Sequence, residues 1–76
     1  MYFVVELQTM QDGTVGNLVT AHENKNDALS KYHGVLQYAA LSDLPVHAAV
    51  VLDEEGRQVA REAFVRNMPA ANEEVK

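Results

Sequence analysis

Hydrophobic and polar residues follow two different periods along this chain. Along residues 2–10 they alternate, which is the pattern of a β-strand with two unlike faces. From Asn24 to Leu41, apolar residues recur at spacings of three and four, which is the pattern of an amphipathic helix. Residues 46–52 form the most apolar run, and further strand-like segments cover residues 14–22 and 57–65. The sequence therefore predicts the element order ββαββ.

The boundaries of these segments carry residues that suit turns and helix ends. Gly13 and Gly56 predict two hairpin turns, because glycine accepts a positive φ without a Cβ clash. Asn24 predicts the helix N-cap, and Asp27 lies three residues later, where a carboxylate reaches back and faces the positive helix end. Pro45 follows the helix and prevents its continuation. The apolar stripe of the helix consists of Leu29, Tyr32, Leu36 and Ala40, with Ala28, Val35 and Ala39 beside them.

Two glycines fall inside predicted elements. Gly16 interrupts the second strand and predicts a β-bulge there. Gly34 lies in the middle of the helix, where glycine costs about 1 kcal/mol relative to alanine. We expect this cost to be offset by close packing of the helix against the sheet.

The two most apolar strands, residues 2–10 and 46–52, are expected at the centre of one sheet. Numbered along the chain, the order 2-1-3-4 places them there and makes every neighbouring pair antiparallel. One helix then covers one face of the sheet. The predicted fold class is α+β, with a four-stranded antiparallel sheet and a single helix.

The other face of the sheet is expected to stay uncovered and partly apolar. We expect it to carry His47, Ala49 and Val51 of the third strand, with Tyr2 and Val4 beside them. Exposed apolar patches above a few hundred Å² usually mark an interaction site. The sequence therefore predicts a homo-oligomer, with a dimer as the first expectation, or another protein partner. Two sheets that stack would give an α-β-β-α dimer, and pairing of sheet edges is the alternative.

Chain length and composition support the same expectation. The chain has 76 residues and no cysteine, so a single domain is expected at residues 1–66, with a flexible C-terminal tail at residues 67–76. A chain this short buries only about 60% of its unfolded surface, and it has no disulfides to compensate. Association is a remaining source of stability. The sequence shows no signal peptide, and no apolar run approaches the roughly 20 residues that span a bilayer. We therefore expect the protein in the cytoplasm of the host cell.

The charge balance bears on the kind of partner. Six basic residues stand against 11 acidic ones, for a formal net charge of −5. Non-specific affinity for nucleic acid depends on basic contacts to phosphate. The composition therefore disfavours nucleic acid as the principal partner.

Three histidines are the obvious candidates for chemistry. His22, His33 and His47 lack the i, i+4 or H-x-H spacing of a local metal-ligand pair. We expect two at the surface or in an interface and one partly buried with a backbone hydrogen bond, and no metal or cofactor. Tyr32, His33 and Tyr38 either line a pocket or flank the core, and the core placement is the commoner one.

The charged strand residues have two interpretations. Glu6 either pairs with an arginine such as Arg61, across strands or across a dimer, or binds a cationic or polar ligand. No cysteine nucleophile, G-x-S-x-G motif or Gly-rich phosphate loop ahead of a helix is present. The sequence therefore predicts a protein that is not an enzyme.

Several short stretches carry a resemblance. They are Tyr2-Phe3-Val4-Val5-Glu6-Leu7-Gln8-Thr9, Asp12-Gly13-Thr14, Gly16-Asn17, Lys31-Tyr32-His33 and Pro45-Val46-His47-Ala48-Ala49-Val50. Together they resemble short reading frames in phages and prophages of anaerobic gut bacteria, over residues 2–65. The resemblance implies a phage-borne accessory role and brings no activity with it.

Three functions are therefore expected, in order. The first is a non-catalytic phage or prophage accessory protein that binds another macromolecule through a sheet face or edge, for example to inhibit a host defence. The second is an oligomeric protein that sequesters a nucleotide-like signal in a pocket between subunits. The third is a structural component of a phage tail module. Candidate interface or ligand residues for these functions are Tyr2, Val4, Glu6, His22, Tyr32, His33, His47, Ala49, Val51 and Arg61.

Overall fold

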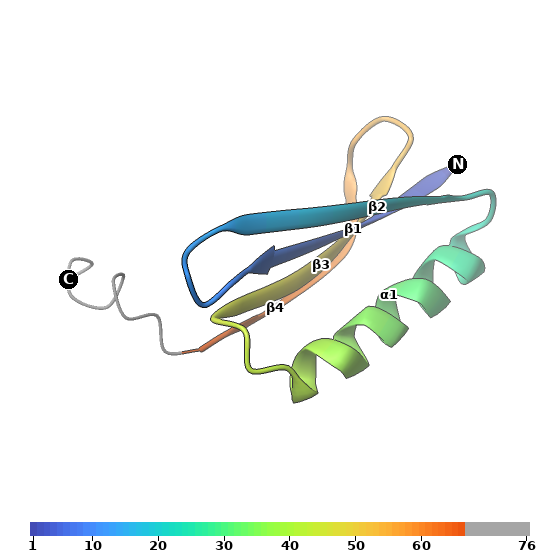
Figure 1. The fold of residues 1–76 in the computed structure, drawn as a ribbon. Helices are drawn as coiled ribbons and strands as arrows, with labels where there is room; N and C mark the ends of the chain where they lie inside the picture. The colour runs from blue at the N-terminus through green and yellow to red at the C-terminus, as the bar shows by residue number, and fades with distance from the viewer. Residues whose placement is uncertain (67–76) are drawn as a thin grey trace.

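The predicted element order is confirmed in the computed structural model of the protein (Figure 1). The structure describes residues 1–66, and the tail predicted at residues 67–76 lies outside them. The elements are β1 (Tyr2–Thr9), β2 (Val15–His22), α1 (Lys25–Leu41), β3 (Val46–Asp53) and β4 (Gln58–Val65). The hydrophobic periods therefore located each element to within one or two residues.

The four strands form one antiparallel sheet in the order β2-β1-β3-β4, as predicted. β1 pairs with β2 over its full length, and with β3 on its other side. Because β2 and β3 both run antiparallel to β1, they run parallel to each other. The chain crosses between them through α1, which lies against one face of the sheet (Figure 1).

The core lies between α1 and the two central strands. The sheet contributes Val4 from β1 with Ala49 and Val51 from β3, all at most 2% exposed. The buried residues of the helix are Ala28, Tyr32, Val35 and Ala39. Ala28 and Ala39 are 0% exposed, and these small side chains let the helix approach the sheet closely. Tyr32 of the predicted stripe is thus buried together with the three residues predicted beside it, while Leu29 and Leu36 are partly buried and Ala40 is exposed.

The prediction of which sheet face stays open was wrong. Val4, Ala49 and Val51 lie under the helix, and Tyr2 packs partly buried against the same cluster. The strand alternation was correct, but the helix covers the opposite face from the one expected. Both faces of β1 and β3 are rich in apolar residues, so alternation alone did not distinguish them.

The uncovered face, called the open face below, is still apolar. Residues directly opposite each other in antiparallel strands point to the same side of a sheet, so the strand registers assign its members. Its apolar residues are Phe3, Val5, Leu7, Val15, Val19, Ala21, Val46, Ala48, Val50, Leu52, Ala63 and Val65. Among the described strand residues of this face, Arg61 is the only charged one. Val15, Val19 and Val65 are 71%, 56% and 68% exposed.

Turns and the helix start follow the sequence prediction. Gly13 and Gly56 have φ angles of 92° and 85°, where a Cβ would be strained. The Asn24 side chain accepts a hydrogen bond from the Asp27 amide at 2.8 Å, which makes it the N-cap. The Asp27 carboxylate accepts one from the Asn24 side-chain amide at 3.0 Å. The start of the helix is therefore capped by hydrogen bonds between two residues that are close in sequence.

The bulge predicted at Gly16 does not form. Gly16 pairs regularly with Gln8, and the Met10 side chain lies 3.5 Å from the position of a Cβ there. The irregularity in the sheet is instead between β3 and β4, where the register shifts at Val51 and Leu52. A side chain at position 16 would therefore make only ordinary van der Waals contacts, and Gly16 marks no irregularity in its strand.

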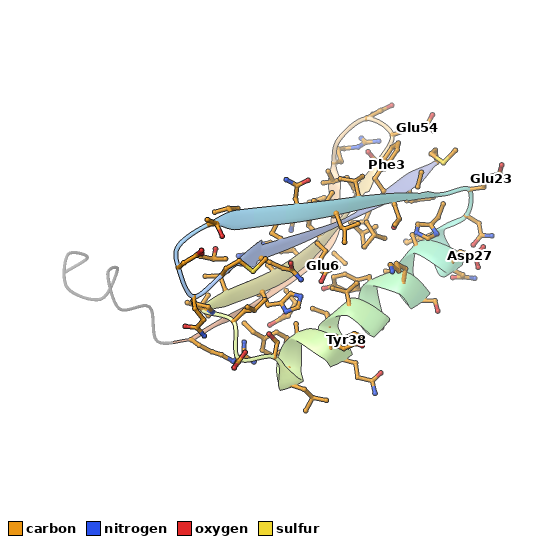
Figure 2. All side chains as sticks on the ribbon, viewed as in Figure 1. Phe3, Glu6, Glu23, Asp27, Tyr38 and Glu54 are labelled. Carbon is orange, nitrogen blue, oxygen red and sulfur yellow. The ribbon has the colours of Figure 1, made fainter. Side chains whose placement is uncertain are left out.

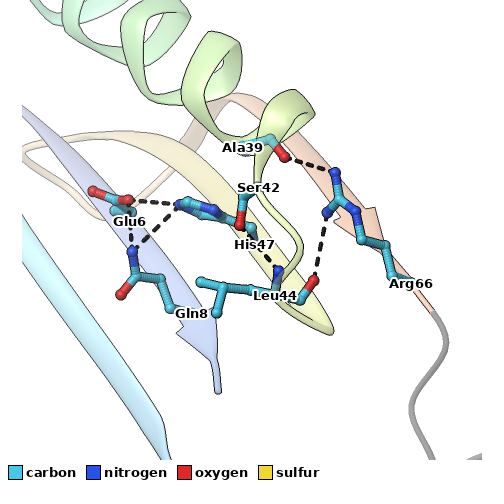
Figure 3. A network of polar contacts seen from close by, with 7 residues as sticks. All are labelled: Glu6, Gln8, Ala39, Ser42, Leu44, His47 and Arg66. Carbon is cyan, nitrogen blue, oxygen red and sulfur yellow. Dashed lines mark hydrogen bonds and ion pairs between the residues drawn. The ribbon is translucent and has the colours of Figure 1, made fainter. Parts of the chain in front are cut away.

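Arg66 closes the C-terminal end of the helix from across the fold (Figure 3). Its guanidinium donates hydrogen bonds to the carbonyls of Ala39 at 2.8 Å and Ala40 at 3.2 Å. These carbonyls belong to the last helical turn, which has no basic residue of its own. The Ala39 carbonyl also accepts from the Ser42 amide at 3.2 Å, so Arg66 adds a charged donor to the helix C-terminus and opposes its negative end. Within the described residues, no helix is both long and apolar enough to cross a membrane.

Candidate functional site

A small cluster of polar side chains lies between the sheet and the helix (Figure 3). Gln8 of β1 and His47 of β3 are direct cross-strand partners, and Glu6 lies two residues along β1 on the same face. The imidazole Nε2 of His47 is 2.7 Å from Oε2 of Glu6. The side-chain amide of Gln8 donates to the same oxygen at 3.1 Å. The strand register therefore brings together three residues that are up to 41 positions apart in sequence.

His47 is the buried polar residue of this cluster. Its side chain is 5% exposed and that of Glu6 is 17% exposed. The contact with Glu6 assigns the ring proton to Nε2, since a carboxylate only accepts. Nδ1 then remains buried without a hydrogen-bond partner among residues 1–66. The expected backbone hydrogen bond of a buried histidine is thus replaced by a side-chain bond to Glu6.

A groove runs along this cluster between α1 and β1. It encloses about 540 Å³, within the roughly 300–1,000 Å³ typical of ligand pockets. Figure 2 shows Glu6 on the sheet and Tyr38 on the helix that faces it. The residues that line this groove are Glu6, Gln8, Ser30, Lys31, Gly34, Val35, Tyr38 and His47.

Gly34 lines the groove and does not pack against the sheet. No atom lies within 4 Å of a Cβ built on it, so the expectation of close packing was wrong. Tyr38 is 77% exposed, so its expected role as core flank was also wrong. Gly34 instead leaves space beside the polar cluster, and Tyr38 lines that space.

The other predicted site residues are dispersed. His22 contacts the hydroxyl of Thr20 at 2.9 Å on β2, and His33 is exposed on the helix. Tyr32 is 6% exposed and belongs to the core. Arg61 lies on the open face, opposite Val50. No single pocket therefore gathers the three histidines with Tyr32 and Arg61.

Pairing of Glu6 with Arg61 within one chain is excluded by the register. Glu6 is opposite Ala49, and Ala49 is opposite Glu62, so these residues share the helix-covered face. Arg61 points to the open face. The prediction that a sheet-face interface includes Val4, Ala49 and Val51 was likewise wrong, because these residues are already buried under the helix.

Burial raises the pKa of Tyr32, and the negative charge of nearby Glu62 adds to the increase, while Arg61 opposes it. At the hairpin tips, hydrogen bonds from Thr14 lower the pKa of Asp12. The Arg57 backbone amide, the largest cause, similarly lowers the pKa of Asp53. These last two carboxylates hold turns, since each accepts from backbone amides of its own loop.

Gln8 and Lys31 are site residues that the sequence reasoning missed. The signal for Gln8 was its i, i+2 spacing from Glu6, which places both on one strand face. Lys31 is one helical turn from Gly34 and Val35, on the same side of the helix. The relation of Gln8 to His47 depends on strand register, and that of Lys31 depends on how α1 packs on the sheet. In the described part of the chain, no three His, Asp or Glu side chains gather as metal ligands.

Searches of protein-family models, curated proteins and solved structures returned no match to this chain. The functional proposals below therefore rest on the geometry of the molecule and on the sequence.

The polar cluster makes a testable contribution to stability. We expect Glu6→Leu to lower the free energy of unfolding by about 1–3 kcal/mol, because it leaves the buried His47 ring without a partner. The double variant Glu6→Leu, His47→Leu is expected to be more stable than Glu6→Leu alone, since both polar groups are then gone. Urea unfolding of the wild type and of these variants measures the difference.

The matched control is Glu62→Leu, which removes an exposed carboxylate from the same sheet face. It is expected to change the free energy of unfolding by no more than about 0.5 kcal/mol. A double variant that is less stable than Glu6→Leu would contradict the assigned role of the pair.

Proposed function

We propose that this protein is a small non-catalytic phage or prophage accessory protein of the host-cell cytoplasm, which acts by binding another macromolecule through the open face of its sheet. The observation that carries the proposal is the chemistry of that face. Twelve apolar residues and one charge, Arg61, occupy its strands, and no element of the described chain covers them. A contiguous apolar surface of this kind marks an interaction site.

A second copy of the chain is a macromolecule whose surface matches the open face. Two identical sheets have the same twist, and twisted sheets stack face to face at about 30° with their inner side chains interdigitated. The product is a two-fold α-β-β-α sandwich with both helices outside. The apolar residues of the two open faces then form a second core layer between the two sheets.

The size of the open face fits this dimer. Each of the four strands has eight residues, which at about 3.4 Å per residue and 4.8 Å between strands gives a face of roughly 500 Å² in projection. Stacking two faces therefore removes about 1,000 Å² from water, the lower bound for a stable interface. Edge pairing through β2 or β4 would bury less and leave the apolar face exposed.

Sedimentation over a wide concentration range tests the proposal. We expect the mass of two chains at all but the lowest concentrations, because the interface is apolar. The result that contradicts self-association is a single-chain mass throughout. If a single-chain protein also fails to bind a dye specific for exposed apolar surface, the open face is not an interaction site and the binding function is lost as well.

A further inference from the structure

The groove between α1 and β1 has hydrogen-bond acceptors that its own residues do not use. Oε2 of Glu6 takes the bonds from both Gln8 and His47. The amide nitrogen of Gln8 is identified by this contact, because a carboxylate cannot donate to an oxygen. Oε1 of Glu6 and Oε1 of Gln8 receive no hydrogen bond from any described residue. The internal bonds thus converge on one oxygen of Glu6 and leave the side-chain oxygens Oε1 of Glu6 and Oε1 of Gln8 free to accept, besides the buried Nδ1 of His47.

The position of Gln8 keeps its free oxygen uncovered. Oε1 of Gln8 lies 3.8 Å from the position of a Cβ on Gly16, its partner across β1 and β2. The neighbouring helix wall is also open, because Gly34 has no side chain and nothing lies within 4 Å of its missing Cβ. Gly34 therefore gives access to the polar floor from the helix side.

We infer that this groove binds a small organic cation that presents N–H donors on one end and a planar apolar body on the other, such as an aryl amidine. The carboxylate of Glu6 and the carbonyl oxygen of Gln8 match the N–H groups in charge and in hydrogen-bonding role. Val35 and the ring of Tyr38 line the groove beside them and suit the planar body. The inference concerns the helix side of the sheet and is independent of the open face.

Lys31 is a cation of the chain itself that competes with a bound cation for this groove. Its side chain lines the same groove, but no ion pair joins it to Glu6 among the described residues. An ammonium group near the entrance repels a second cation. Replacing it by methionine keeps a flexible apolar stem and removes the charge, so Lys31→Met is expected to strengthen cation binding.

Titration of the full chain with benzamidine, followed by amide chemical shifts, tests the inference. We expect saturable shifts centred on Glu6, Gln8, Gly34 and Tyr38, and no comparable shifts with benzoate, which has the same ring and the opposite charge. Glu6→Gln preserves an acceptor for His47 and is expected to weaken benzamidine binding about tenfold or more, the usual effect of losing a charged hydrogen bond. Lys31→Met is expected to tighten it.

The outcomes separate clearly. Equal binding of benzoate and benzamidine, shifts centred away from the groove, or unchanged affinity in Glu6→Gln would each overturn the inference. The unfolding temperature of Glu6→Gln shows whether that variant keeps its fold. If it does not, Lys31→Met, at an exposed position, decides the question: unchanged or weaker benzamidine binding in this variant counts against the site.

Discussion

If the protein forms the stacked dimer proposed above, Val50→Glu is expected to convert it to a monomer without unfolding it. Val50 lies on β3, a central strand of the open face, between Val5 on β1 and Arg61 on β4. Stacking two copies would bury the introduced carboxylate of each chain within an apolar layer, and an uncompensated buried charge is costly. In the single chain, the same carboxylate is exposed beside Arg61, where an opposite cross-strand charge is favourable.

Sedimentation and circular dichroism measure the two parts of this prediction. The mass should fall to that of one chain, while the far-ultraviolet spectrum stays that of the wild type. Leu41→Glu is the matched control, because it adds the same charge at an exposed position on the helix, 84% accessible. It should leave the mass unchanged. Dissociation by both variants would point to a general charge effect, and dissociation by Leu41→Glu alone would place the interface on the helix side.

Tyr32→Ala is expected to cause the largest loss of stability of any single truncation in the helix. The Tyr32 ring is 6% exposed and belongs to the cluster with Val4, Ala49 and Val51. Removing a buried aromatic side chain costs about 3–5 kcal/mol, and a domain of this size has little more than that in total. The melting temperature should fall by at least about 12 °C at equal protein concentration, and the variant is expected to be largely unfolded near body temperature.

Tyr38→Ala is the matched control on the same helix. Tyr38 is 77% exposed, so its removal should change the free energy of unfolding by no more than about 0.5 kcal/mol. Similar losses in the two variants would contradict the placement of the helix face. Thermal unfolding by circular dichroism distinguishes the outcomes.

Tyr32→Phe keeps the ring and removes the ionisable hydroxyl. Because the pKa of Tyr32 is raised in the folded protein, its contribution to stability is complete below the ordinary pKa near 10 and is lost as pH rises through the folded value. The wild type should therefore lose more stability than Tyr32→Phe above about pH 10. An identical alkaline profile for the two proteins would argue against a raised pKa for Tyr32.

The candidate groove shows where prediction from sequence reaches its limit. Glu6 and His47 were recognisable as candidates one at a time, by residue type. Their contact at 2.7 Å depends on the pairing of β1 with β3. The apolar character of both strands predicted that they are neighbours, but nothing in the local sequence of either strand determines the register of the pairing. Gly34 was misinterpreted for a related reason, because its surroundings come from the angle at which the helix crosses the sheet.

What the sequence determined by itself is the local structure. The periods of apolar residues, the N-cap at Asn24 and the positive-φ glycines act over a few residues, so they specified the five elements and their turns. The apolar character of β1 and β3 also placed them at the centre of the sheet. These features depend on neighbours in sequence and on the preference of apolar strands for burial.

Only the tertiary structure decided which face the helix covers. Both faces of β1 and β3 are apolar enough to be buried, so their alternation is compatible with either arrangement. The choice follows from the hand of the β2–α1–β3 crossover and from the close fit of Ala28 and Ala39 against the sheet. That one choice buries Val4 and Val51, places Phe3 and Val50 on the open face, and brings Glu6 and His47 under the helix. The reason is that side chains on a strand point alternately to its two sides.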